Sequence, residues 1–240
     1  MKYITEYLWE QGDRYENEDS IAILQLNVGK TPAILAIVAD GIGGFSNGEL
    51  ASAVVTNRLR CAFENSSYNP DNFNIRTLKH ILKRELYSCH RELLEYGSQK
   101  SCPLGTTISL VCIIKSQGFL INTGDSRIYR FPSGRFHSFL SGSSVRQLTN
   151  DNTNDTGRLT SCIGHGQKMQ LCYRKFHIRQ GDTFLVCSDG FYRRIQPEIN
   201  NFSHLLKLYP QNHFLNCLYS LAIKRGETDN ASAITIQVTK

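Results

Sequence analysis

Aspartates stand at the ends of three apolar segments of the sequence. Asp40 follows the run AILAIVA, Asp189 follows FLVCS, and Asp229 stands just before the segment ASAITIQV. A charge at the end of a buried strand costs free energy unless it is paired, and a single Asp there is explained by a turn that accepts backbone hydrogen bonds. Three such residues in one chain favour another explanation.

Two further acidic sites extend the pattern. Glu18 and Asp19 precede the run SIAILQL, and Asp125 lies within the motif TGDSR. Together the acids predict oxygen ligands for metal ions. Because the set contains no His or Cys, the ligands favour the hard cations Mg²⁺ and Mn²⁺. A carboxylate shared by two such ions would place a water between them, and that water becomes a nucleophile near neutral pH.

The predicted chemistry is transfer of a phosphoryl group to water, since cations neutralise the charge that develops on the phosphate oxygens. Arg14, four residues before Glu18, is the candidate cation from the chain itself. Its planar guanidinium can hold two phosphate oxygens at once. Taken alone, Arg14 is better explained as a solvated surface side chain.

Strands and helices must bring these acids together. Segments rich in Ile and Val predict strands at residues 20–26, 33–39, 108–114, 118–122, 127–131, 183–187 and 231–238. Helical spacing of apolar residues predicts helices from 46 to about 63, opened by a Ser-x-x-Glu capping box, from about 72 to 96, near 202–208 and near 214–224. Because the helices are gathered between runs of strands, the pattern favours an α+β layered sandwich.

Composition bounds the class of protein. The 240 residues are 40% hydrophobic and 20% charged, and no Pro/Gly/Ser-rich linker divides them, which predicts one domain over 1–240 and excludes collagen, coiled coil and a disordered tail. The net charge of +6 is scattered in pairs, so we expect no nucleic-acid partner.

The cellular location and the state of the cysteines are predicted from patterns that the sequence lacks. It has no basic-then-apolar leader pattern, and its apolar runs are too short to span a bilayer, so we expect no membrane association and a cytoplasmic location. The eight cysteines form no CxxC pair, which predicts free thiols.

Six motifs follow one another along the chain. They are RYENEDS at 14–20, DGIGG at 40–44, GTT at 105–107, GDSR at 124–127, GD at 181–182 leading to SDG at 188–190, and DN at 229–230. In this order the chain resembles the metal-dependent protein phosphatases of type 2C, the PPM family, over nearly its whole length. The resemblance implies an antiparallel β-sandwich flanked by helices on both sides, with a dinuclear metal site in a cleft at one end.

The resemblance also implies ligand roles for individual residues of these motifs. Asp40 would bridge the two ions, and Gly41 would lend its backbone carbonyl. Asp189 and Asp229 would complete the shell of one ion. The residues that would bind the other ion, directly or through water, are Glu18 and Asp19.

The remaining motif residues are assigned in the same way. Asp125 matches the position that helps to bind a third, weaker ion in bacterial members, and Arg14 matches the phosphate clamp. The residues expected to support the site are Gly43, Gly44, Arg127 and Asn230. The two glycines would permit close backbone approach or a positive φ, and the other two side chains would brace the site by hydrogen bonding.

The function implied by the resemblance is hydrolysis of phosphoserine and phosphothreonine in proteins by a water that bridges two Mg²⁺ or Mn²⁺ ions. The partners would be phosphoproteins and a cognate Ser/Thr kinase whose action the enzyme reverses. The chain departs from the family pattern at the flap, a segment that family members carry beside the site. After LTND at 148–151, only a short polar stretch, 154–158, precedes LTSCIG at 159–164. We expect the flap to be almost absent.

Other interpretations of the same residues are weaker. Cys187 and Arg193 have the Cys-x5-Arg spacing of a cysteine-dependent phosphatase, but Asp189 would repel phosphate within that loop. Asp40 as an aspartyl nucleophile would require a second Asp where Ile42 stands.

Two more alternatives concern zinc and loss of activity. The possible zinc ligands have a spacing that fits no common finger, and they are Cys162, His165, Cys172 and His177. A catalytically inactive phosphatase-like binding module is the competing class. Such modules usually lack a metal Asp, and none is lost here. Arg193 and Arg194 are expected at the rim of the cleft, where they would attract phosphorylated substrates.

Overall fold

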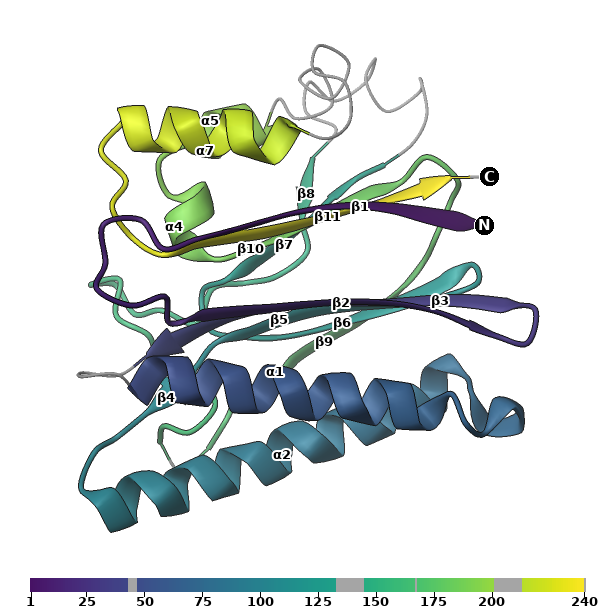
Figure 1. Cartoon of the computed structure of the whole chain (residues 1–240), viewed down its shortest axis with the longest axis horizontal. Helices are drawn as coiled ribbons and strands as arrows, with labels where there is room; N and C mark the ends of the chain where they lie inside the picture. Colours follow the sequence, from purple (N-terminus) through teal and green to yellow (C-terminus); the bar gives the residue numbers. More distant parts are fainter. Residues whose placement is uncertain (43–46, 133–144, 167, 201–212, 240) are drawn as a thin grey trace.

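The computed structural model describes residues 1–42, 47–132, 145–166, 168–200 and 213–239. Figure 1 shows four layers, in which two sheets face each other and helices cover the outer face of each. Both sheets are antiparallel throughout the described strand pairs. This confirms the predicted α+β sandwich flanked by helices on both sides.

The first sheet joins strands from both ends of the chain. Its strand order is β1-β11-β10-β7-β8. The strands are β1 (Lys2–Glu10), β7 (Arg127–Phe131), β8 (Arg146–Gln147), β10 (Thr183–Cys187) and β11 (Ala231–Thr239). Because β1 pairs with β11 along nine residues, the N- and C-terminal segments lie side by side (Figure 1).

The second sheet uses the middle of the chain in the order β2-β3-β5-β6-β9, and the two-residue β4 pairs with the end of β3. The strands are β2 (Asp19–Val28), β3 (Thr31–Ile42), β4 (Gly105–Thr106), β5 (Ile108–Ile114), β6 (Gln117–Thr123) and β9 (Cys172–His177). Every residue of β5 is buried. Such a strand, covered on both faces, explains the continuous apolar run seen in the sequence.

Two long helices pack on the second sheet, and shorter ones pack on the first (Figure 1). The long ones are α1 (Asn47–Ser66) and α2 (Ile75–Lys100), with the short 3₁₀ turn η1 (Pro70–Asn72) between them, and the shorter ones are α4 (Asp189–Tyr192), α5 (Gln196–Asn200) and α7 (Phe214–Lys224). The Asn74 side chain accepts hydrogen bonds from the amides of Arg76 and Thr77, which sets the start of α2.

The predicted elements differ from the observed ones mostly at their ends. The strands at 108–114, 127–131 and 183–187 and the helix at 214–224 are confirmed exactly. The second helix begins and ends a few residues later than predicted, because Asn74 rather than Asn72 caps it and the left-handed Ser101 ends it. The predicted helix near 202–208 and the capping residue Ser46 lie outside the described residues.

The sequence analysis missed β1, β8 and β9. All three lie at sheet edges, where one side of the strand has no partner. Their residues alternate or are mostly exposed, as in CYRKFH of β9, so they lack the apolar run by which central strands are recognised.

The core has three parts, one between the sheets and one under each helical layer. All eight cysteines are free, as the sequence analysis predicted. Among the described residues, no helix has the length and apolar character needed to cross a bilayer.

Candidate active site

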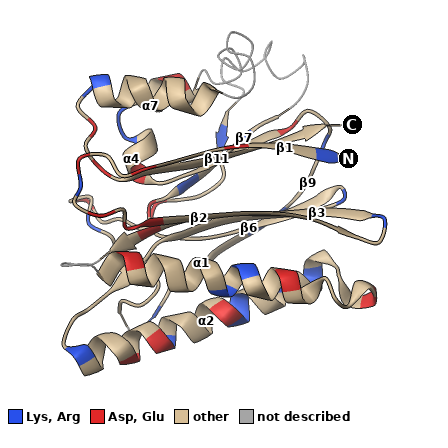
Figure 2. Cartoon of the chain, viewed as in Figure 1, with Lys and Arg blue, Asp and Glu red and all other residues tan. Residues whose placement is uncertain are grey.

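Four of the predicted ligand residues, two from each sheet, meet at one end of the sandwich. Asp19 opens β2 and lies directly opposite Asp40 of β3 in the strand register. In the other sheet, Asp189 follows β10 and Asp229 lies just before β11, whose paired ends are neighbours. Figure 2 shows the acidic segments in red on both sheets at the end where α4 lies. Antiparallel pairing therefore brings together acids that are far apart in the sequence.

Burial and mutual repulsion raise the pKa values of these carboxyls. Burial is the main cause at Asp40, whose pKa is raised well above its usual range, with the charges of Asp19 and Asp189 adding to the effect. Burial likewise raises the pKa of Asp19 to about 7 and that of Asp125 to about 6. Burial also raises the pKa of Asp189. Ionising all of these carboxyls at once is therefore costly in the metal-free protein.

Hydrogen bonds tie the cluster across the two sheets. The buried Ser188 hydroxyl donates to Asp19 Oδ2 at 2.9 Å, so the residue before Asp189 holds a carboxylate of the opposite sheet. The indole Nε1 of Trp9 donates to the Asp19 carbonyl at 2.8 Å. Asp19 is therefore fixed by its side chain and by its backbone.

Two arginines lie against the acids. The Arg14 Nη2 is 2.9 Å from Asp229 Oδ1, and the Arg14 side chain is 56% exposed. Arg193 forms an ion pair with Asp189 and lies 3.6 Å from Asp229 Oδ2. Arg193, expected at the rim, thus contacts the predicted metal ligands directly, and its position four residues after Asp189 on one helical turn was the available signal.

Glu227 is an acid of this region that the sequence analysis did not single out. It is buried, and its Oε1 accepts hydrogen bonds from the backbone amides of Thr228 and Asp229 at 3.1 and 3.2 Å. Both Arg193 and Arg194 approach it at 3.8 Å. Glu227 therefore orders the loop that presents Asp229, and its spacing of two residues from Asp229 could have indicated this.

The donor set fits hard divalent cations. It consists of carboxylate oxygens, and Asp125 Oδ1 is buried without a hydrogen-bond partner among the described residues. Within the described ranges, no three His, Cys, Asp or Glu side chains converge as a finished ligand set. Without an ion the carboxylates repel one another. Ion pairs with Arg14 and Arg193 neutralise part of their charge. The residues fit an ion whose charge would replace these pairings.

Asn230 braces the segment that carries Glu18. Its Oδ1 accepts from the Glu18 amide at 3.0 Å, while its Nδ2 donates to the carbonyls of Gln11 and Glu16 at 2.7 and 3.0 Å. The Asn230 amide thus joins the start of β11 to the loop before β2. Burial raises the pKa of Glu18 at the end of this loop.

Replacing Asn230 with Asp tests this brace. The substitution keeps the shape but turns the donor that faces two carbonyls into a repelling oxygen, so we expect the free energy of unfolding to fall by about 2 kcal/mol or more. Urea unfolding of the metal-free protein measures the change. Asn154→Asp, in the loop 152–160, is the comparison variant, and equal losses in the two variants would contradict the role of Asn230.

Arg127 is linked to the acidic cluster through other side chains. It forms a two-pronged pair with Asp151, with Nη2 to Oδ2 at 2.6 Å, and its guanidinium lies 3.9 Å from the ring centroid of Tyr192. The Tyr192 hydroxyl in turn donates to the Asp125 carbonyl at 3.0 Å. Arg127 therefore positions Asp125 through Tyr192.

Gly41 lies where two backbones nearly touch. A Cβ on Gly41 would overlap the Gly48 carbonyl at the start of α1 and would lie 2.5 Å from the Glu18 carbonyl. Only glycine permits this approach of β3, α1 and the Glu18 loop. Gly43 and Gly44, also predicted as supporting residues, lie outside the described residues.

The segment after Asp151 is short and closed on itself. Thr153 and Leu159 form a bridge, and Asn154 Oδ1 accepts hydrogen bonds from the amides of Thr156 and Arg158. Asn152 Oδ1 accepts from the Gly124 amide at 2.9 Å, which ties this loop to the turn that carries Asp125. The loop thus supports the Asp125 turn.

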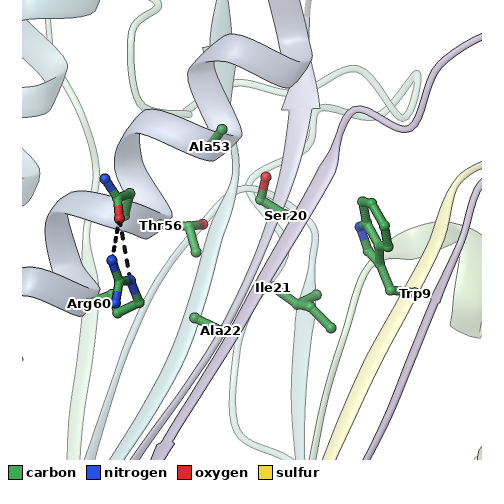
Figure 3. Close-up of a pocket in the computed structure, with 8 residues that line it drawn as sticks. Trp9, Ser20, Ile21, Ala22, Ala53, Thr56 and Arg60 are labelled. Carbon is green, nitrogen blue, oxygen red and sulfur yellow. Dashed lines mark hydrogen bonds between the residues drawn. The ribbon is translucent and has the colours of Figure 1, made fainter.

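A separate pocket opens between α1 and β2 (Figure 3). It has a volume of about 360 Å³ and is lined by residues such as Trp9, Ser20, Thr56 and Arg60. None of its lining residues is a carboxylate, and Figure 3 shows Arg60 hydrogen-bonded to a neighbouring helix side chain, which is Asn57. This pocket is not the acidic cleft.

The two sulfur-based alternatives lose support. Cys187 is fully buried, and burial raises the pKa of its thiol, which opposes formation of the thiolate that a cysteine-dependent phosphatase needs. Of the possible zinc ligands, Cys172 and His177 are the first and last residues of β9, so about 17 Å of extended strand separates them and they cannot hold one ion.

The pH dependence of stability follows from the raised pKa values. Between about pH 4 and pH 7 the unfolded chain has lost the protons of Asp19 and Asp125, while the folded protein keeps them up to pKa values of about 7 and about 6. The folded state binds more protons, so we expect the metal-free protein to lose stability as the pH rises through this range. Thermal melts in EDTA at pH 5 and pH 7.5 measure the loss, and Asp125→Asn should reduce it. A melting temperature that is higher at pH 7.5 would contradict the sign.

The sequence profile of the family described as Protein phosphatase 2C matches residues 13–217. The chain belongs to this family. Membership confirms the resemblance seen in the motifs, and it makes the chain a metal-dependent protein serine/threonine phosphatase that uses Mg²⁺ or Mn²⁺.

Individual relatives agree with the family. The chain is 24% identical over 226 residues to a putative protein phosphatase of Mycoplasma genitalium, covering 86% of this chain and 85% of the relative. It is 26% identical over 193 residues to the protein phosphatase PhpP of Streptococcus pneumoniae, covering 76% of each.

Solved structures share the fold. PppA, described as a key regulatory component of T6SS in Pseudomonas aeruginosa, has a TM-score of 0.80 at 22% identity over 99% of this chain and 98% of its own. The catalytic domain of the serine threonine protein phosphatase PstP, solved in complex with two manganese ions, has a TM-score of 0.77 at 22% identity over 99% of each chain.

Proposed function

We propose that this chain, acting as one domain over residues 1–240, dephosphorylates phosphoserine and phosphothreonine in the substrates of a Ser/Thr kinase and so reverses that kinase. The observation that carries the proposal is the gathering of Asp19, Asp40, Asp189 and Asp229 from both sheets into one cluster with raised pKa values. A charge-rich cluster of this kind is maintained at a cost in stability, which is typical of functional sites.

The proposed metal ligands are the residues of this cluster. Asp40 would be shared between two ions together with the carbonyl of Gly41, and the others would be Glu18, Asp19, Asp189 and Asp229, with Asp125 toward a third ion. When bound, the ions neutralise charge on the phosphoryl oxygens and lower the pKa of water. The Ser188 hydroxyl holds Asp19 in place for this task, and Asn230 holds the Glu18 loop.

Arg14 is the proposed clamp for the substrate phosphate. Its side chain is more than half exposed at the edge of the cluster, and its partner there is Asp229. To bind phosphate, the guanidinium would release Asp229 and turn its fork toward two phosphate oxygens. Arg14 would thus orient the phosphoryl group beside the carboxylates that hold the ions.

The experiment is hydrolysis of p-nitrophenyl phosphate and of a phosphothreonine peptide with Mn²⁺, with Mg²⁺ and with EDTA. We expect hydrolysis of both compounds with either ion, and none in EDTA. Activity that survives EDTA and is lost in Cys187→Ser would overturn the proposal in favour of cysteine chemistry. No activity under any condition would favour a binding module.

A further inference from the structure

A second cavity lies away from the acidic cluster and is lined mainly by basic residues. It has a volume of about 280 Å³, and its lining includes Arg130, Arg146, His177, Arg179 and Asp182. These residues come from β7, β8, the end of β9 and the turn before β10. Four segments of the chain therefore contribute to one concave, polar surface.

The positive charges of this cavity exceed the negative ones. Asp182 is the only acid in its lining among the described residues, and it is fully buried. Its Oδ2 accepts hydrogen bonds from Arg130 Nη2 at 2.6 Å and from the Arg179 amide at 2.7 Å. The described lining thus holds one carboxylate and three guanidinium groups, and the sequence has no Asp or Glu between Asp125 and Asp151.

The position of Arg146 adds to this imbalance. Arg130 and Arg146 lie directly opposite each other in the pairing of β7 with β8. Like charges in such a pair repel each other and destabilise the sheet. Arg146 and Arg179 have exposed side chains, so their cationic groups are available to an anion from solution. A bound anion would relieve the repulsion.

Arg130 is held in a fixed orientation. Its guanidinium lies 5.8 Å from the ring centroid of Phe176 and 5.6 Å from that of Phe184, and these two rings stack at 5.2 Å. Its Nη2 also donates to the His177 carbonyl at 2.8 Å. A guanidinium ordered before binding loses little freedom when it binds a ligand.

The cavity and the acidic cluster lie at opposite ends of β7 and β10. In this strand pair Arg127 faces Cys187 at the cluster end, and Phe131 faces Thr183 at the cavity end. At roughly 3.4 Å per residue, the strand separates the two ends by about 14 Å. One phosphate group therefore cannot contact both places.

We propose that this cavity is a second phosphate-binding site, formed by Arg130, Arg146 and Arg179. A phosphate monoester carries close to two negative charges near neutral pH, and Asp182 can balance only one of the three guanidinium charges in the described lining. Its oxygens also suit the planar fork of arginine, whereas a single carboxylate would leave positive charge over. The phosphate comes either from a phosphorylated residue of a protein or from a free phosphate compound.

The test is calorimetric titration of the EDTA-treated protein with inorganic phosphate, with a phosphothreonine peptide and with the same peptide unphosphorylated. We expect Arg146→Ala/Arg179→Ala to weaken phosphate binding about tenfold or more. The control pair Arg174→Ala/Lys175→Ala, exposed on the neighbouring β9, should change it less than twofold. Both pairs should hydrolyse p-nitrophenyl phosphate with Mn²⁺ as the unaltered protein does, because neither touches the acidic cluster.

The outcomes separate the sources of the phosphate. Binding of inorganic phosphate that is lost in Arg146→Ala/Arg179→Ala supports a site for free phosphate compounds. Binding of the phosphopeptide alone supports a site for a phosphorylated residue of a protein. Equal weakening in both pairs would show a general effect of positive charge and overturn the site. Failure of the unaltered protein to bind either compound would overturn it as well, whatever the hydrolysis assay shows.

Discussion

Asp40→Asn is expected to lower kcat for p-nitrophenyl phosphate with Mn²⁺ by at least about a thousandfold, which corresponds to about 4 kcal/mol of transition-state stabilisation. The amide keeps the shape of the side chain but removes the charge that two ions would share. Since burial and neighbouring charges already raise the pKa of Asp40 well above its usual range, the neutral Asn resembles the protonated carboxyl. We therefore expect the fold to persist.

Thermal melts separate this effect from unfolding. In EDTA, Asp40→Asn should melt no lower than the unaltered protein, because the neutral amide replaces a carboxyl whose ionisation is already disfavoured by burial. Added Mn²⁺ should stabilise the unaltered protein by about 3 kcal/mol at a hundred times its dissociation constant, and the variant much less. Asp155→Asn, on the exposed loop, should change neither quantity. Substantial activity in Asp40→Asn would refute the assignment of Asp40 as a metal ligand.

Gly41→Ala is the second change with a large expected effect. The new methyl group would overlap the Gly48 carbonyl and press on that of Glu18, and both are backbone atoms that cannot rotate away. We expect a loss of about 3 kcal/mol in the free energy of unfolding, since overpacking of a tight contact costs about this much. In a chain of this size the melting temperature should fall by roughly 6–12 °C.

Activity should fall with stability in Gly41→Ala, because the Glu18 loop and the Gly41 carbonyl are displaced together. Gly29→Asn is the control, since Gly29 has a left-handed φ of 61° that Asn tolerates and no atom lies within 4 Å of its Cβ position. It should alter stability by less than about 0.5 kcal/mol. An unchanged melting temperature in Gly41→Ala would contradict the close approach of β3 and α1.

Local patterns in the sequence determined much of the architecture. The central strands β5, β7 and β10 and the helix α7 were predicted with their observed bounds, because burial on both faces or along one helical face leaves a periodic apolar pattern. The edge strands β1, β8 and β9 left no such pattern, since most of their residues are exposed or half-buried. Helix ends shifted by a few residues because capping depends on geometry as well as residue type.

The acids of the site were also visible in the sequence, since Asp40, Asp189 and Asp229 interrupt or border apolar runs where a charge is costly. What only the tertiary structure decided is which groups neutralise them. The contact of Arg193 with Asp229, the approach of Arg193 and Arg194 to Glu227, and the cavity that joins Arg130 to Arg146 and Arg179 all depend on side chains from separate segments. The strength of an electrostatic interaction depends on the distance between the charges in the folded protein, and a single sequence does not give that distance.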